Sequence, residues 1–186
     1  MELISERSAD GYSDAITEKE YGHLRLCILP DFGVLFFHLT SLLQIIRKSD
    51  MKLLMFYTKE WWYKTASKTL EHVPAEDKEE TMTGAVVIFF HCEAEDEEKY
   101  PGVVQKCIKN AKWLAGKFDT KNVVLHSFNH LSSSKSSPEF AKALLDEVRQ
   151  RLENTGFTLM VTPFGYFNEF RMHVAGDSLA KVFKEF

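Results

Sequence analysis

Residues 51–186 alternate between continuous apolar runs and segments with a helical repeat. Residues 85–92 (AVVIFFHC) are apolar throughout and rich in β-branched and aromatic side chains. This composition is typical of a central strand that is buried on both faces. Shorter runs predict the other strands, so that the expected set is 52–57, 85–92, 122–128, 157–162 and 170–174.

Two segments between these runs carry apolar residues at helical spacing. Pro101 suits the first turn of a helix that continues to about Phe118, and Pro138 opens a second helix that ends at Gly156. The order ββαβαββ predicts a single α/β domain with helices packed on a mixed sheet. The two helical crossovers imply neighbouring parallel strands with right-handed connections.

Residues 1–50 lack this regularity, so we divide the chain into residues 1–50 and 51–186. The apolar run 32–46 falls short of the roughly 20 residues that span a bilayer, and the first residues are acidic rather than basic, unlike a signal peptide. We therefore expect no membrane association. Two interpretations of residues 1–50 stay open: upstream sequence included through the choice of start codon, or an accessory helix that covers the domain or recruits a partner.

Composition excludes several classes of protein. The chain is 45% hydrophobic and 27% charged, which is ordinary for a globular domain. Its three cysteines (Cys27, Cys92 and Cys107) lie far apart, which argues against a disulfide framework or a structural zinc site and fits a reducing cytoplasm. The formal net charge is −4, so no basic excess indicates an autonomous nucleic-acid-binding protein. Contact with RNA would need a local patch or a partner.

Three local features each allow a functional and a structural interpretation. The acidic run 93–98 is either a cation site or, as we favour, a solvated turn before the next helix. Trp61, Trp62 and Tyr63 suit either base stacking or, more simply, packing. The first predicted helix carries lysines on its polar side that suit either phosphate contacts or a solvated face: Lys106, Lys109, Lys112 and Lys117.

Two short runs place polar side chains at the ends of predicted strands. The first reads Phe128-Asn129-His130-Leu131-Ser132-Ser133, and the second reads Pro163-Phe164-Gly165-Tyr166-Phe167-Asn168-Glu169-Phe170. Together they resemble two signature segments of the editing domain at the N-terminus of archaeal threonyl-tRNA synthetases. The family pattern is aromatic-Ala-His-Leu-Ser-Ser in the first segment and Pro-Phe-Gly-aromatic-Tyr-Lys in the second. The resemblance covers residues 51–186 and implies the mixed α/β fold shared with D-aminoacyl-tRNA deacylases.

The resemblance implies hydrolysis of the ester that joins a wrong amino acid to tRNA. Within it, His130 takes the place of the family histidine, whereas Phe167 replaces the tyrosine and Asn168 the lysine. Lys181 falls near the position of a family acidic residue. Loss of a positioned acid, base or charge costs typically about 10²–10⁴ in rate, so altered positions matter for activity.

These matches define the predicted site. The catalytic candidates are His130, Asn168 and Lys181. The substrate-binding candidates are Asn129, which replaces a small residue, and the matched or neighbouring positions Ser132, Pro163, Phe164, Gly165, Tyr166 and Phe167. The other histidines in strands, His91 and His126, are expected to be satisfied locally. The sequence has no metal-ligand spacing, glycine-rich phosphate loop or dinucleotide fingerprint, so we expect no metal and no cofactor.

Three hypotheses for function follow. The chain is a freestanding deacylase that hydrolyses mischarged Ser-tRNA(Thr) in trans, with an altered pocket. Alternatively, it is a catalytically silent module that binds tRNA or a synthetase, because the Tyr-Lys pair has become Phe167-Asn168. Thirdly, it acts on a different aminoacyl or D-amino-acid adduct. The resemblance implies as partners the acceptor end of tRNA(Thr), threonyl-tRNA synthetase and, from the fold family, a second copy of the chain.

Overall fold

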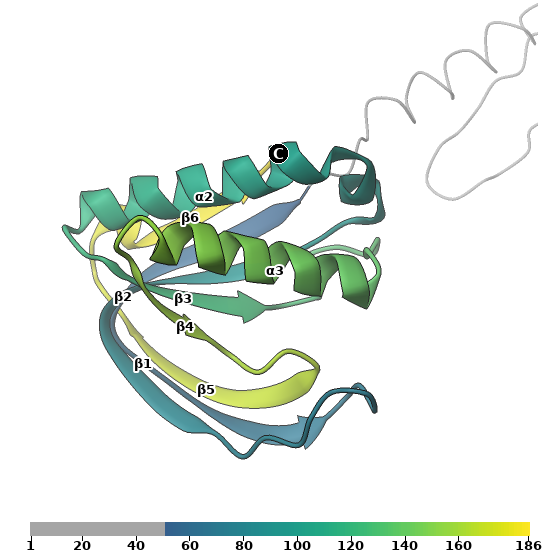
Figure 1. Cartoon of the computed structure of the whole chain (residues 1–186). Coiled ribbons are helices and arrows are strands. Elements are labelled where there is room, and N and C mark those ends of the chain that lie inside the picture. Colours follow the sequence, from purple (N-terminus) through teal and green to yellow (C-terminus); the bar gives the residue numbers. More distant parts are fainter. Residues whose placement is uncertain (1–50) are drawn as a thin grey trace, which may run out of the picture. The chain divides into compact units, whose positions relative to one another are not determined.

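A computed structural model describes residues 51–186, and the two interpretations of residues 1–50 lie outside the described residues. These 136 residues form one sheet of six strands with two helices packed against it (Figure 1). The strands are β1 (Lys52–Lys68), β2 (Glu79–His91), β3 (Asn122–Ser127), β4 (Thr158–Val161), β5 (Tyr166–Val174) and β6 (Lys181–Glu185). The helices are α2 (Tyr100–Lys117) and α3 (Pro138–Glu153), and short 3₁₀ turns are η1 (Ala94–Lys99) and η2 (Ser178–Ala180).

The sheet is mixed, as the sequence predicted. Its order is β4-β3-β2-β1-β5, with β6 also paired to β1. Strand β2 runs parallel to β3, and β3 runs parallel to β4, which are the two pairs that the helical crossovers connect. Strand β1 is antiparallel to β2 on one side and to β6 and β5, in turn, on the other.

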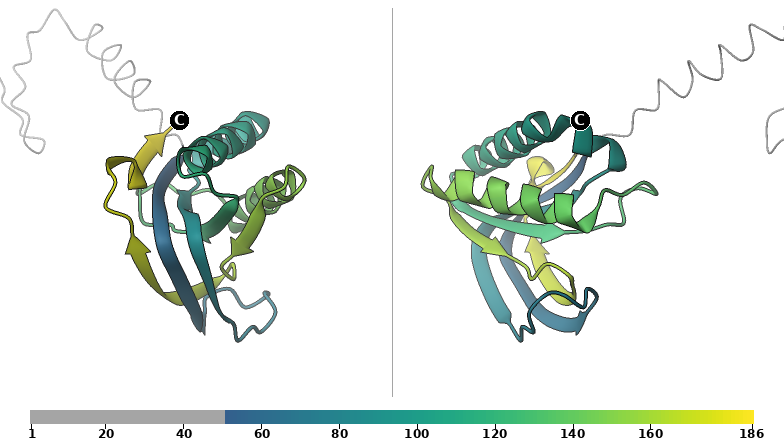
Figure 2. Two further views of the ribbon diagram at one scale, coloured as in Figure 1. Left: turned by 90° about the vertical axis from the view of Figure 1, so that its left-hand side faces the viewer. Right: turned by 45° about the vertical axis from the view of Figure 1, so that its right-hand side comes forward.

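Strand β1 is far longer than the predicted run 52–57. Its first half pairs with β6 and its second half with β5, and the register against β5 shifts between Thr58 and Glu60 and again between Thr65 and Ser67. Such bulges bend a strand and increase its twist. Strands β1 and β5 accordingly curve away from the helical layer (Figures 1 and 2).

The helices cover one face of the sheet and enclose the main core. Side chains alternate along β2, so that Val86, Ile88 and Phe90 face the helices, where they meet the buried stripes of α2 and α3. Both helices begin with the predicted prolines, and both are confirmed to within a few residues. Burial of each such aliphatic or aromatic side chain contributes about 1.5–3 kcal/mol.

The opposite face carries a second, smaller cluster that the helices do not cover. Ala85, Val87 and Phe89 from β2 join Trp61 and Tyr63 from the curved half of β1, and all five are buried. Trp61 packs edge-to-face against Phe89 with ring centroids 5.8 Å apart. The prediction that residues 85–92 are buried on both faces is confirmed, and for Trp61 and Tyr63 the structure supports the packing interpretation.

One further strand, β6, was not predicted, so the order ββαβαββ gains a final β. Four of its five side chains are exposed at the edge of β1 and only Val182 is half-buried, which leaves too short an apolar signal to recognise in the sequence. Strand β5 likewise begins at Tyr166 rather than at the predicted residue 170. Strand β5 is mostly exposed or half-buried, so its pattern is weak.

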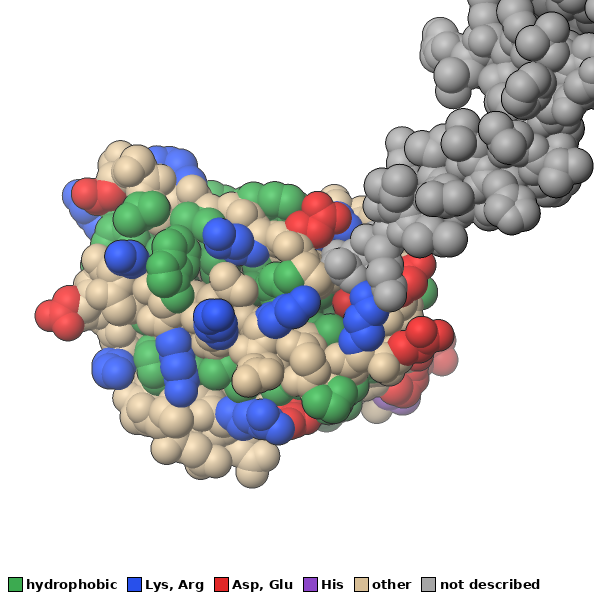
Figure 3. Space-filling model, turned by 90° about the horizontal axis from the view of Figure 1, so that it is seen from above, with side chains coloured by type: hydrophobic (Ala, Val, Ile, Leu, Met, Phe, Trp, Pro, Cys, Tyr) green, Lys and Arg blue, Asp and Glu red, His purple; other side chains and the backbone are tan. Residues whose placement is uncertain are grey.

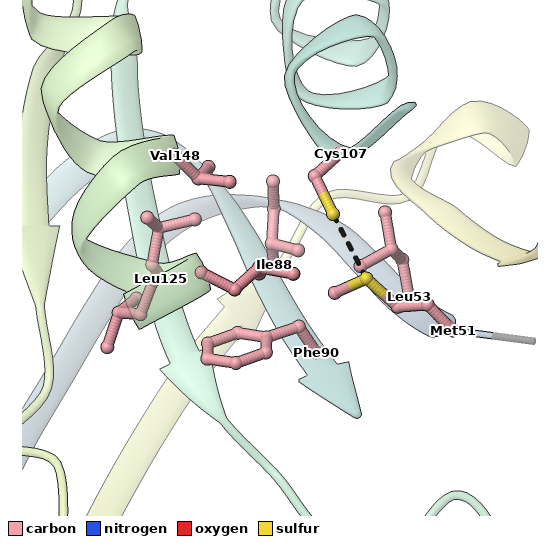
Figure 4. Close-up of a pocket in the computed structure, with 9 residues that line it drawn as sticks. Met51, Leu53, Ile88, Phe90, Cys107, Leu125 and Val148 are labelled. Carbon is pink, nitrogen blue, oxygen red and sulfur yellow. Dashed lines mark hydrogen bonds between the residues drawn. The ribbon is translucent and has the colours of Figure 1, made fainter. Parts of the chain in front are cut away.

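A small hollow lies inside the main core between the sheet and both helices (Figure 4). Its volume is about 10 Å³, which is at the lower limit for a single water molecule. Its walls are apolar, and Cys107 Sγ lies 3.1 Å from Met51 Sδ across it. An apolar void of this size is a packing defect rather than a binding site.

Candidate functional site

The candidate site is a cleft of about 330 Å³ at the edge where β3 ends and β5 begins. The curvature of β1 and β5 brings the end of β1 and the start of β5 opposite the segment that follows β3. We refer to residues 126–136 as the β3 wall and to residues 164–170 as the β5 wall. The cleft is lined by Thr69, Leu70, His126, Ser127, Phe128, Asn129, His130, Lys135, Ser136, Pro138, Ala141, Phe164, Gly165, Tyr166, Phe167, Asn168 and Phe170.

His130 lies on the β3 wall, just beyond the last residue of β3. The Phe128 N–H donates to the Phe90 carbonyl at 2.9 Å, and the His130 N–H donates back to the Phe128 carbonyl at 3.0 Å. This turn presents an exposed imidazole whose ring packs edge-to-face on Phe128 at 5.1 Å. None of the hydrogen bonds among residues 51–186 engages the His130 ring nitrogens, so both are available to water or to a ligand.

Groups from β2 and η1 fix the backbone of the β3 wall from behind. The fully buried His91 ring bonds to the Ser134 carbonyl through Nε2 at 2.7 Å and to the Leu131 N–H through Nδ1 at 3.3 Å. A neutral ring with its proton on Nε2 satisfies both bonds, because Nε2 then donates and Nδ1 accepts. The local satisfaction predicted for His91 is confirmed, and the ring also orients the segment that carries His130.

The acidic run contributes to the same scaffold. The Ala94 N–H donates to Ser134 Oγ at 3.3 Å, and the Ser137 N–H donates to Glu97 Oε1 at 2.7 Å. This backbone hydrogen bond lowers the pKa of the Glu97 carboxyl. Ser137 also caps α3, because its Oγ accepts from the Phe140 N–H. Among the described residues there is no group of three or more potential ligands that could hold a metal ion.

Gly165 determines the shape of the β5 wall. Its φ of +79° lies in the left-handed region, and a Cβ added there would come within 3.1 Å of the Leu70 and Val73 side chains. The Gly165 carbonyl accepts from the Thr69 N–H at 2.8 Å. Only glycine fits this close approach, which joins the end of β1 to the start of β5.

The polar side chains of the β5 wall serve mainly to hold that turn. Tyr166 donates its hydroxyl proton to the Pro74 carbonyl at 2.8 Å, and the same oxygen accepts from the Glu76 N–H at 2.8 Å. Asn168 Nδ2 donates to the Tyr166 carbonyl at 3.1 Å. Asn168 Oδ1 is buried and has no hydrogen-bond partner among the described residues, which leaves one unused acceptor beside the cleft.

The cleft gathers most, but not all, of the predicted site residues. Asn129, His130, Phe164, Gly165, Tyr166, Phe167 and Asn168 line it. Ser132, Pro163 and Lys181 do not. Lys181 lies at the start of β6, where its ammonium donates to the Ala175 carbonyl at 3.2 Å. Phe167 is 62% exposed, so the residue at the position of the family tyrosine presents an apolar ring to solvent.

Lys135 is the functional candidate that sequence reasoning missed. It is exposed, it lines the cleft on the same wall as His130, and no ion pair among the described residues involves it. It is the one Lys or Arg in the lining, which contains no Asp or Glu. The only signal in the sequence was a single lysine within the serine run, and its place beside His130 depends on how that run folds back.

His126 was expected to be satisfied locally, and this is confirmed, because its Nδ1 lies 2.8 Å from Thr162 Oγ1. Burial lowers the pKa of His126 to about 4, so the ring is neutral at physiological pH. Its neighbours are the aromatic rings of Phe89, Phe128 and Phe170. This neutral ring supports the β3 wall from below.

The cleft combines an exposed imidazole, one ammonium and apolar walls, without a carboxylate. Such a set can orient a water molecule and stabilise negative charge on a substrate. The cysteines among the described residues do not contribute a nucleophile there. Burial raises the pKa of the Cys92 thiol to about 12 and that of Cys107 well above its usual value, and neither lines the cleft.

Comparison with known proteins relates the described domain to one family. The family model for the archaea-specific editing domain of threonyl-tRNA synthetase matches residues 51–186. Similar curated proteins are threonine–tRNA ligases of Thermococcus onnurineus, 30% identical over 135 residues, and of Methanoregula boonei, 31% identical over 137 residues. These alignments cover 71% and 72% of this chain but 22% of each ligase. The chain thus spans about a fifth of the length of these relatives.

The likeness extends to a solved structure, a c-Myc DNA unwinding element binding protein. It is 13% identical, with a TM-score of 0.51, and the match covers 72% of this chain and 97% of that one. At this identity the match shows the fold alone, and it agrees with the mixed α/β class that the sequence predicted. Within the described residues, no helix has both the length and the apolar character that crossing a membrane requires.

Proposed function

Because the chain belongs to the family of archaea-specific editing domains of threonyl-tRNA synthetase, we propose that it hydrolyses the ester of serine mischarged onto tRNA(Thr), acting in trans. One observation carries the proposal beyond family membership. His130 and Lys135 lie on the same wall of one cleft, both exposed, and no carboxylate accompanies them. An ester of a tRNA 3′ end brings to such a site a carbonyl that becomes negatively charged during attack.

In the proposed reaction, a water oxygen attacks the ester carbonyl carbon, and the bond from that carbon to the ribose oxygen breaks. His130 accepts a proton from the water and returns one to the departing ribose oxygen, a role that an imidazole can fill near neutral pH. The products are free serine and a tRNA with its terminal hydroxyl restored. Serine and threonine differ by a methyl group, and a small pocket can discriminate by about 1–3 kcal/mol on that basis.

Lys135 is proposed to supply the positive charge that the family lysine would provide. Asn168 occupies that lysine's place, and its amide nitrogen is engaged with the Tyr166 carbonyl. The Lys135 ammonium approaches the cleft from the β3 wall and stabilises the oxyanion or the terminal phosphate. An electrostatic group of this kind contributes about 10²–10³ in rate.

The acceptor end of tRNA(Thr) is the partner that the proposed reaction requires. Further proposed partners are threonyl-tRNA synthetase, which would release the mischarged tRNA, and a second copy of this chain. We also propose a cytoplasmic location, where translation takes place. Light scattering of the purified chain tests the homodimer directly, since a mass near twice 21.5 kDa is expected.

A binding module without catalysis is the second candidate. It is favoured by the Asn168 and Tyr166 side chains, which line the cleft but use hydrogen-bonding groups to hold the turn of the β5 wall. In that case the cleft would bind the acceptor end of a tRNA and release it unchanged.

Release of amino acid from Ser-tRNA(Thr) and Thr-tRNA(Thr) by the full chain tests the first candidate against the second. We expect selective release of serine, with a loss of about 10²–10⁴ in kcat for His130→Ala. His72→Ala is the matched control, because His72 lies outside the cleft lining. No release from either substrate, together with measurable tRNA binding, would instead establish the binding module.

A further inference from the structure

Helix α2 presents a surface of lysines that belongs neither to the core nor to the cleft. At 100° per residue, Lys109 points opposite to the buried stripe of Val104, Cys107, Ala111 and Leu114. Lys106 and Lys112 flank Lys109 on either side, one turn before and after it. Within Tyr100–Lys117 there are four lysines and no Asp or Glu. Figure 3, which looks down on the helical layer, shows Lys and Arg side chains spaced across that face of the molecule.

The neighbouring helix has a different charge pattern. On α3, Lys142 pairs with Asp146 at 2.5 Å, Arg149 pairs with Glu153 at 2.8 Å, and Arg151 pairs with Glu147. These i,i+4 pairs neutralise the outer face of α3. None of the salt bridges among residues 51–186 involves a lysine of α2, so the charge of its outer face is uncompensated by the described part of the chain.

The C-terminal strand adds to this surface. Lys106 Nζ lies 5.3 Å from the ring centroid of Phe186, and Lys184 Nζ lies 5.4 Å from that of Trp113. These cation–π contacts hold two ammonium groups beside the helix and place Lys184 next to α2. Lys106, Lys109 and Lys112, with Gln105 and Ile108, also border a shallow open hollow on this face.

We propose that this surface, formed by Lys106, Lys109, Lys112 and Lys184, binds the sugar-phosphate backbone of tRNA outside the cleft. The inference rests on the proposed function, since it gives the body of the same substrate a place to bind. Lysine is a point-charge ligand for phosphate, and spaced single charges suit a phosphate chain. The domain carries 18 Lys and Arg against 19 Asp and Glu over residues 51–186, so the surface is a local concentration of charge.

Phosphate chains fit this surface better than a lipid bilayer does. Its one large exposed apolar side chain is Trp113, which is 37% exposed and whose ring lies against the Lys184 ammonium. A peripheral membrane helix would instead present a row of apolar residues for insertion. The apolar stripe of α2 is buried against the sheet and is unavailable for that purpose.

The test measures binding of deacylated tRNA(Thr) to the full chain by fluorescence anisotropy over a range of salt concentrations. The variant is Lys106→Gln, Lys109→Gln, Lys112→Gln, and the matched control on α3 is Lys142→Gln, Arg149→Gln, Arg151→Gln. Both remove three positive charges. We expect the α2 variant to weaken binding on the order of 10- to 100-fold at about 0.1 M salt and to flatten the salt dependence by about one unit of slope per lysine.

The α3 control should bind within about threefold of the unaltered chain, and circular dichroism verifies that both variants fold. Equal losses in the two variants would overturn the inference, because net charge rather than the α2 surface would then govern binding. Unchanged tRNA binding by the α2 variant would also overturn it, as would loss only of binding to vesicles that contain phosphatidylserine.

This experiment separates the inference from the proposed reaction, because deacylated tRNA carries no ester. If hydrolysis is absent but binding depends on α2, the proposed function fails and the binding surface stands. If the chain is active, the α2 variant should raise KM for Ser-tRNA(Thr) and leave kcat unchanged. Hydrolysis of seryl-adenosine, which lacks the tRNA body, should then be unaffected.

Discussion

The two walls of the cleft use their polar side chains in different ways. On the β3 wall, the side chains of His130 and Lys135 line the cleft without hydrogen-bond or ion-pair partners among the described residues, while His91 and Glu97 hold the backbone from behind. On the β5 wall, Tyr166 and Asn168 bond to backbone groups of the chain itself. The side chains left open to a ligand thus lie on the β3 wall, which in the proposed reaction carries the reactive groups, whereas those of the β5 wall maintain the shape of the cleft.

This division explains how a chain that lacks the family Tyr-Lys pair can retain a site. If chemistry and shape reside on separate walls, the exchange at positions 167 and 168 alters the wall that carries fewer reactive groups. In the proposed reaction Lys135 supplies the missing charge from the opposite side. Changes on each wall should therefore have different effects, kinetic on one and structural on the other.

After His130→Ala, the largest effect is expected for Lys135→Ala, which should lower kcat for serine release by about 10²–10³, since it removes the one ammonium of the cleft lining. Lys135→Arg should retain most of the rate because it keeps the charge. Lys181→Ala is the matched control, with an expected change below about threefold, because Lys181 bonds to Ala175 outside the cleft. A larger loss of kcat for Lys181→Ala than for Lys135→Ala would contradict the assignment of the reactive groups to the β3 wall.

The β3 wall should also be the acid-sensitive one. Burial lowers the pKa of His126 to about 4 from an ordinary value of 6.5, so the unfolded chain binds this proton more readily than the folded chain. The free energy of unfolding should therefore fall as pH decreases from about 6.5 to about 4, by about 3 kcal/mol at most.

Urea denaturation at several pH values measures this dependence. His126→Asn keeps a polar group near Thr162 but cannot titrate in this range, so its stability curve should be flatter across the same interval. An equally steep curve in this variant would assign the acid sensitivity to another group.

On the β5 wall, Tyr166→Phe should reduce stability rather than chemistry. It leaves the Glu76 N–H and the Pro74 carbonyl without their shared hydroxyl, at a cost of about 1–2 kcal/mol. Thermal unfolding measures the loss, and kcat at a temperature well below the transition should change by less than about threefold. A fall in kcat comparable to that of Lys135→Ala would mean that the hydroxyl takes part in the reaction.

The smallest effect is expected when the family pair is restored by Phe167→Tyr with Asn168→Lys. In the unaltered chain the gain in serine release should be modest, because Lys135 already provides a charge. In the Lys135→Ala background the same pair should recover about tenfold in kcat, equivalent to about 1.4 kcal/mol. Single-turnover release assays compare the two backgrounds, and equal gains in both would show that the two lysine positions act independently.

The sequence predicted the parts of the fold that local patterns determine. Both helices carry a proline at the start and an apolar stripe, and the buried strand 85–92 is apolar on both faces, so each is recognisable within its own segment. The second half of β1 and the whole of β6 were missed. Bulges interrupt the second half of β1, which forms because β2 and β5 pair with it, and β6 lies at an edge, where it forms because β1 pairs with it.

The same contrast holds for the site. His130 and the run from Phe164 to Asn168 lie in recognisable motifs, so the sequence identified them. Lys135 and His91 come from the serine run and from a buried strand, and only the folded backbone brings Lys135 to the cleft of His130 and His91 to the neighbouring Leu131 N–H. The role predicted for Lys181 rested on counting along the chain, and the hydrogen bond to Ala175 places this lysine elsewhere.

Strand β5 is held to the sheet by a single ladder, whereas β3 lies between β2 and β4. Amide hydrogens of β5 should therefore exchange with solvent through small local openings, and those of β3 only through larger ones. Such an opening would separate the two sides of the cleft while the helical layer stays intact. If the cleft binds the 3′ end of a tRNA as proposed, local opening of this edge strand would widen the cleft for the terminal nucleotide.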